Sequence, residues 1–91
     1  MRCEWDDKKN MANWAKHGLS FQEADDFDWA TAMLEVDERH DYGEQRQTAL
    51  GYIRGRLMKL VFTHRDDTVR LISLRKANDR ERAAYEKNQK A

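Results

Sequence analysis

The chain has 91 residues, and its 17 Lys and Arg residues balance its 17 Asp and Glu residues. This length suits a single domain over residues 1–91 with one modest hydrophobic core. Zero net charge argues against a nucleic-acid partner, but the charge is unevenly spread. Residues 1–45 hold five basic and twelve acidic residues, whereas residues 46–91 hold twelve basic and five acidic ones. This asymmetry predicts a charged functional surface, or a surface for an acidic partner segment.

Composition also excludes several classes of protein and site. No apolar run approaches the ~20 residues that a membrane helix needs. The first residues lack the apolar stretch of a signal peptide. The single cysteine, Cys3, cannot form an internal disulfide, and with three scattered histidines it offers no metal-ligand spacing. We therefore expect a cytoplasmic protein without a metal, a cofactor or a membrane partner.

The first half predicts a short strand followed by two helices. Residues 2–5 favour a strand, Asp6 then supplies an N-cap, and Gly18 ends the first helix. The capping box at residues 20–23 starts a second helix. Helical spacing predicts that the apolar face of the first helix consists of Met11, Trp14 and Ala15.

The second half predicts four strands and a last helix. The strands are expected at residues 31–36, 46–53, 56–64 and 68–75, and the helix at residues 79–88. Short connections between the last three strands imply antiparallel hairpins. The order β-α-α-β-β-β-β-α predicts an α+β domain, an antiparallel sheet with its helices packed on one face.

Basic side chains are concentrated on this sheet and on the last helix. Strand alternation places Arg75 with Val69 and Leu71 on one face, and Lys59 with Leu57 on a face of its own strand. A cationic sheet face suits a phosphate backbone, although a basic surface that only maintains solubility has the same pattern. An Arg at the end of the last strand suits the negative charge that grows during RNA cleavage.

Other side chains could move protons or stack on a base. His40 and Glu44 lie in a polar loop just before Arg46, where they could act as general acid and base. Glu44 could instead simply pair with Arg46. Tyr85 could stack on a base or donate a proton, or only pack the last helix onto the sheet. His17 is predicted to be a residue at the end of a helix, with no role in catalysis.

Several short segments occur in the order typical of one family. They are Glu4-Trp5-Asp6, Asn13 through Phe21 (NWAKHGLSF), His40, Glu44, Arg46, Gly51, Arg56, Arg70 through Ala77 (RLISLRKA), Arg80-Glu81-Arg82 and Tyr85. Together they resemble the BrnT family of ribonuclease toxins from type II toxin–antitoxin systems. Residues 22–32 depart from that family, because members commonly have a proline there and this chain has none.

The resemblance implies a RelE-like fold and a metal-independent endoribonuclease that cleaves RNA and inhibits translation. It also implies a BrnA-like antitoxin that binds DNA, forms a hetero-oligomer with the toxin and represses their operon. We expect the ribose 2′-OH to attack the adjacent phosphate, so that DNA survives. The expected catalytic residues are His40, Glu44, Arg46, Arg56, Arg75 and Tyr85. The expected RNA-binding residues are Arg65, Arg70, Lys76 and Arg80. The alternative is a non-catalytic module that binds the antitoxin and acts as co-repressor.

Overall fold

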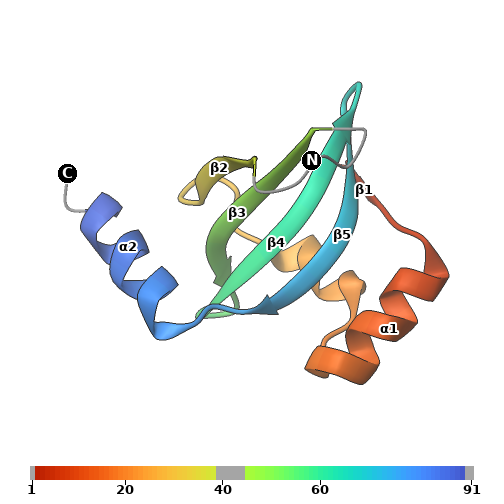
Figure 1. Ribbon diagram of the computed structural model, residues 1–91, viewed down its shortest axis with the longest axis horizontal. Helices are drawn as coiled ribbons and strands as arrows, with labels where there is room; N and C mark the ends of the chain where they lie inside the picture. Colours follow the sequence, from red (N-terminus) through yellow and green to blue (C-terminus); the bar gives the residue numbers. More distant parts are fainter. Residues whose placement is uncertain (1, 39–44, 90–91) are drawn as a thin grey trace.

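The structure is a computed structural model that describes residues 2–38 and 45–89 (Figure 1). Its five strands form a sheet in the order β1-β5-β4-β3-β2. The elements are β1 (Arg2–Glu4), α1 (Asp7–His17), the 3-10 helix η1 (Phe21–Asp26), β2 (Met33–Asp37), β3 (Arg46–Ile53), β4 (Arg56–Arg65), β5 (Thr68–Lys76) and α2 (Asp79–Gln89). The expected α+β class is confirmed. The second helix, expected to be α-helical, is instead 3-10.

Strand directions differ from the prediction at one edge of the sheet. Strands β2 to β5 form antiparallel neighbours, as expected from their short connections. β1, however, runs parallel to β5, with Arg2 beside Thr68 and Glu4 beside Arg70. The sheet is therefore mixed, and the prediction of an antiparallel sheet was wrong for β1. A long helical connection separates β1 from the other strands, so no tight turn fixed its direction.

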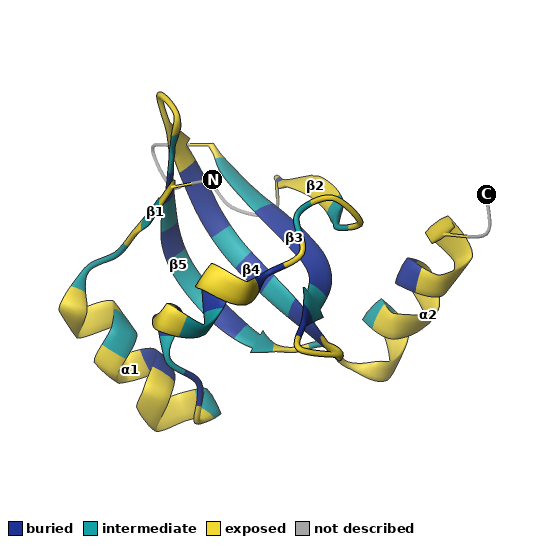
Figure 2. Ribbon diagram, turned by 180° about the vertical axis from the view of Figure 1, so that it is seen from behind, coloured by how far each residue is buried: buried dark blue, intermediate teal, exposed yellow. Residues whose placement is uncertain are grey.

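Helices pack on both faces of the sheet, which corrects the prediction that they share one. Residues of β3 alternate between the faces. Ala49 and Ile53 belong to the larger core with Phe21 of η1, whereas Leu50 packs with Tyr85 of α2 in a second cluster. Figure 2 shows the buried band along β3, β4 and β5, with most of α1 and α2 exposed.

A bulge in β5 changes which residues share a face. Leu74 and Leu71 pair with β4 on the two sides of a register shift, and both are buried with Val69 in the larger core. The extra residue moves every later side chain to the other face. Arg75 therefore lies beside Lys59 on the α2 face, and the prediction that it shares a face with Val69 and Leu71 was wrong.

α1 is attached to the sheet by a polar residue. Asn13 Nδ2 donates to the carbonyl oxygens of Leu19 at 3.0 Å and Leu74 at 2.8 Å, and Leu74 N donates to Asn13 Oδ1 at 3.0 Å. Met11 and Trp14 are 72% and 61% exposed, respectively. The apolar spacing thus predicted a helix correctly, but the face that it marks points to solvent.

Candidate functional site

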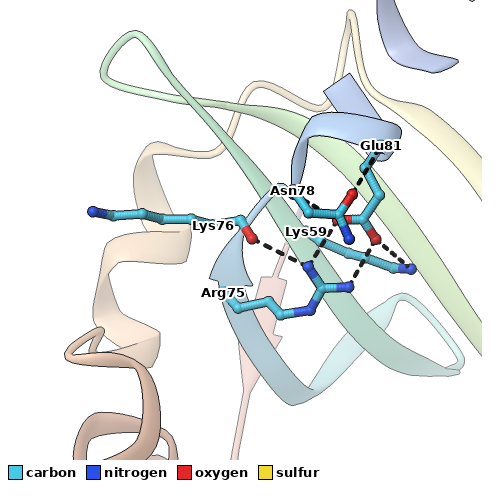
Figure 3. Close-up of polar contacts among 5 residues, drawn as sticks. All are labelled: Lys59, Arg75, Lys76, Asn78 and Glu81. Carbon is cyan, nitrogen blue, oxygen red and sulfur yellow. Dashed lines mark hydrogen bonds and ion pairs between the residues drawn. The ribbon is translucent and has the colours of Figure 1, made fainter. Parts of the chain in front are cut away.

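Two cations of the sheet meet one carboxylate at the start of α2 (Figure 3). Arg75 Nη1 and Nη2 donate to Glu81 Oε1 at 2.8 Å and Oε2 at 2.7 Å. Lys59 Nζ donates to the same Oε2 at 3.0 Å. The exposed fractions of the Lys59, Arg75 and Glu81 side chains are 17%, 31% and 15%. We call these three residues the Glu81 clamp.

Backbone geometry holds the clamp in place. Lys59 and Arg75 are directly paired on β4 and β5. Asn78 and Glu81 form a capping box, because Glu81 N donates to Asn78 Oδ1 at 2.8 Å and Asn78 N donates to Glu81 Oε1 at 3.0 Å. Arg75 Nη1 also donates to the Lys76 carbonyl at 3.1 Å. Two strands and the first turn of a helix therefore fix the three charges together.

The charge of Glu81 is strongly stabilised. Hydrogen bonds from Arg75, the Asn78 N–H and Lys59 outweigh its partial burial and lower its pKa to about 2. The carboxylate is therefore ionised at any physiological pH. One negative charge between two positive ones leaves the clamp with a surplus positive charge.

A second group of cationic residues lies where α1 packs beside β5, the strand that carries Arg75. A hollow between α1 and β5 is lined by Lys9, Ala12, Asn13, Lys16, His17, Ile72 and Ser73; we call it the cationic hollow. Burial, then the charges of Lys16 and Arg75, lower the pKa of His17. The field of Arg75 therefore reaches the end of α1. His17 is the last residue of α1, as predicted, but it also belongs to this charged region.

Sequence reasoning missed Lys16, His17, Lys59 and Glu81 as candidates. A signal was present for three of them, since Lys16-His17-Gly18 and Arg80-Glu81-Arg82 are among the segments that carry the family resemblance. Lys59 had no such signal. Only strand pairing with Arg75 identifies it.

Two of the expected catalytic arginines lie far from each other. Arg46 begins β3, and Arg56 begins β4 beside Ile53 at the other end of β3. Ile53 lies seven positions after Arg46 on β3, a span of roughly 23 Å. These two arginines cannot bind the same phosphate. Arg56 is the closer to Lys59 along β4, but strand alternation turns it to the opposite face.

The expected RNA-binding residues are similarly divided. Lys76 and Arg80 are exposed and lie next in sequence to Arg75 and Glu81, respectively. Arg80 also lines a groove with Lys59 and Glu81. Arg65 is exposed at the far end of β4, beside the hairpin. Arg70 lies at the β1 edge, with Nη1 at 3.6 Å from Glu4 Oε1.

Tyr85 is placed as a packing residue. It is 4% exposed, and its hydroxyl donates to the Thr31 carbonyl at 2.9 Å. Its ring meets that of Tyr52 edge to face, with centroids 5.6 Å apart. The hydroxyl and the ring of Tyr85 therefore both have partners inside the protein. This favours the interpretation that Tyr85 only packs the last helix onto the sheet.

Two candidates lie outside the described residues, namely His40 and Glu44. Across residues 2–38 and 45–89, no group of His, Cys, Asp and Glu side chains is arranged to hold a metal ion. No helix in the same ranges has the length and apolar character to span a membrane.

Fold and site define a small α+β protein whose cations Lys59 and Arg75 lie side by side on β4 and β5, a surface suited to polyanions. Residues 5–81 match the model of a family described as the ribonuclease toxin, BrnT, of type II toxin–antitoxin systems. Because the match covers most of the chain, the protein belongs to this family, and the resemblance is confirmed. Comparison with curated proteins finds no match. Membership implies an RNA substrate and an antitoxin protein as partner.

Proposed function

We propose that the chain is a metal-independent endoribonuclease that cleaves RNA in the cytoplasm and thereby inhibits translation. The observation that carries the proposal is the Glu81 clamp. A carboxylate held by an Arg fork and a Lys occupies the position that two phosphate oxygens would take. A phosphate that displaces Glu81 would therefore find an Arg fork and a Lys already in place to bind it. We propose in addition the RelE-like architecture that the resemblance implies, with the α+β class as its support.

The chemistry needs only the 2′-OH of RNA. Attack of that oxygen on the adjacent phosphorus forms a 2′,3′-cyclic phosphate and breaks the bond to the 5′-oxygen, which leaves as a 5′-OH. Arg75 and Lys59 would stabilise the negative charge that grows on the phosphorane. A base takes the 2′-OH proton, and an acid gives one to the leaving oxygen.

Glu81 is our candidate for the base. In the free protein it is a weak base, since Arg75 and Lys59 lower its pKa to about 2. A phosphate that takes over these two cations would remove their bonds to Glu81, so its pKa would rise toward the ordinary value. For the acid, His40 and Glu44 remain the candidates from the sequence.

Incubation of the purified chain with RNA in excess EDTA tests this function. We expect fragments that end in 2′,3′-cyclic phosphate, and no cleavage of DNA of the same sequence. Arg75→Ala and Lys59→Ala should each slow cleavage at least tenfold. Arg54→Ala is the matched control, because Arg54 pairs with Glu23 and Asp26 away from the clamp. RNA that stays intact both with and without ribosomes would contradict the proposal.

The partner proposed is a BrnA-like antitoxin that binds DNA and represses the operon as a complex with this chain. The occupied clamp favours one alternative, a non-catalytic module, because both cations are already paired with Glu81. Expression of the chain alone separates the two functions. Growth arrest that the antitoxin relieves supports the enzyme, whereas normal growth with tight antitoxin binding supports the module.

A further inference from the structure

Lys9, Lys16 and His17 lie on one side of α1. Together with Ala12 and Asn13 they have the spacing of a single helical stripe, and this stripe lines the cationic hollow. Asn13 binds the main chain of Leu74 at the centre of the stripe. Lys9 and Lys16 are about two turns apart, roughly 10 Å along the axis. Two ammonium groups therefore flank the point where α1 is anchored to β5.

These lysines differ from four cations of the sheet and its hairpin turn, which are neutralised by carboxylates. Arg54, Lys59, Arg70 and Arg75 each pair with a carboxylate. Within residues 2–38 and 45–89, neither Lys9 nor Lys16 has an ion-pair partner, and the residues that line the hollow include no Asp or Glu. Lys9 also lies in the first turn of α1, where the helix dipole disfavours a cation. The hollow therefore carries positive charge that the described fold does not neutralise.

The hollow and the clamp adjoin each other along β5. Ser73 lines the hollow, and Arg75, two residues further on the same strand, belongs to the clamp. Ser73 pairs with Val61 and Arg75 with Lys59, so both lie on the same face of the sheet. The charge of Arg75 contributes, after burial and the charge of Lys16, to the lowered pKa of His17. A strand of RNA with one phosphate at the clamp would therefore place a neighbouring phosphate at the hollow.

We propose that the cationic hollow is a second phosphate subsite, in which Lys9, Lys16 and His17 bind a phosphodiester adjacent to the one held at the clamp. This subsite deepens the proposed ribonuclease function and rests on it. Its ligand is the phosphate of single-stranded RNA. The subsite extends the RNA surface from the basic half of the chain, residues 46–91, to α1 in the acidic half.

Binding of short RNAs that cannot react tests the subsite. The probes are a 2′-O-methyl dinucleotide with one phosphodiester and a trinucleotide with two, titrated against the protein by fluorescence anisotropy. We expect the wild-type chain to bind the trinucleotide at least fivefold more tightly than the dinucleotide. The double variant Lys9→Ala/Lys16→Ala should bind the trinucleotide no more tightly than the dinucleotide. Binding of a longer single strand should also depend less on salt in the double variant than in the wild-type chain. The magnitude of the slope of log K against log salt should be smaller by about 0.7, the value for one phosphate contact.

Lys8→Ala is the matched control, since Lys8 is an exposed lysine of α1 that does not line the hollow. It should keep both the trinucleotide gain and the salt slope, and circular dichroism should show all variants folded. An unchanged gain in the double variant, or an equal loss in Lys8→Ala, would overturn the subsite. Cleavage of RNA by the wild-type chain in the same preparation would show that the ribonuclease proposal survives that result.

Discussion

Arg75 and Glu81 form a two-pronged ion pair, in which the two terminal guanidinium nitrogens donate to the two carboxylate oxygens over 2.8 and 2.7 Å. This geometry fixes the planes of both groups, and so it gives more directional control than a single contact. It also joins the last strand of the sheet to α2. The residue expected to act on RNA is therefore also part of the connection between two elements.

Replacement of Glu81 by Gln should destabilise the protein. The variant leaves Lys59 and Arg75 as neighbouring like charges without a carboxylate, and we expect a loss of about 1–3 kcal/mol. Urea unfolding monitored by tryptophan fluorescence measures it. Glu86→Gln is a suitable control, since Glu86 is an exposed residue of the same helix. Equal losses in the two variants would show that the clamp adds nothing specific.

Acid should weaken the clamp in a defined range of pH. The pKa of Glu81 is about 2 in the folded protein, below its value of 4.5 in the unfolded chain. Its contribution is therefore fully present above pH 4.5 and is lost as the pH falls through about 2. The difference in unfolding free energy between wild type and Glu81→Gln should shrink over this interval. A difference that stays constant from pH 5 to pH 2 would contradict the low pKa.

Substitution of the polar residue Asn13 should destabilise the protein more than substitution of the aromatic residue Trp14, the reverse of the usual order. Asn13→Ala removes three hydrogen bonds and leaves the Leu74 N–H and carbonyl without their partner, at a cost of about 2–4 kcal/mol. Trp14→Ala, at a 61% exposed position, should change stability by less than about 1 kcal/mol. Thermal unfolding of the two variants decides the point. A larger loss for Trp14→Ala would mean that α1 is anchored by its apolar face.

Tyr85→Phe separates packing from catalysis. The change removes the hydrogen bond to the Thr31 carbonyl but keeps the ring against Tyr52, and should cost about 1 kcal/mol. RNA cleavage by the folded variant should stay within about twofold of the wild-type rate. A tenfold loss of cleavage without a matching loss of stability would assign the hydroxyl to the reaction.

Local signals in the sequence predicted local structure well. The capping box at Ser20 forms, with Ser20 N donating to Glu23 Oε2 at 3.0 Å. Arg54 and Gly55 form the tight turn, with positive φ angles of 47° and 80° that suit a hairpin. In each case a few adjacent residues carry all the information that the structure needs.

The long-range features could not be predicted in the same way. The β5 bulge depends on pairing with β4 and reverses the face of Arg75, which strict alternation placed wrongly. The clamp brings together residues 59, 75 and 81, and no sequence pattern predicts that these three side chains are in contact. α1 shows an apolar stripe, but the burial of Asn13 became visible only with its partner on β5. Family resemblance identified the class of toxin without supplying this geometry.

Parallel pairing joins the first strand of the chain to the last one, since β1 lies beside β5. Synthesis proceeds from the N-terminus, so β1 has no partner in the sheet until β5 has emerged from the ribosome. The clamp is later still, because it needs Glu81 of α2. A nascent chain that stops before residue 81 therefore has no complete anion site. The binding site can therefore form only after the ribosome has added Glu81 to the strands that carry Lys59 and Arg75.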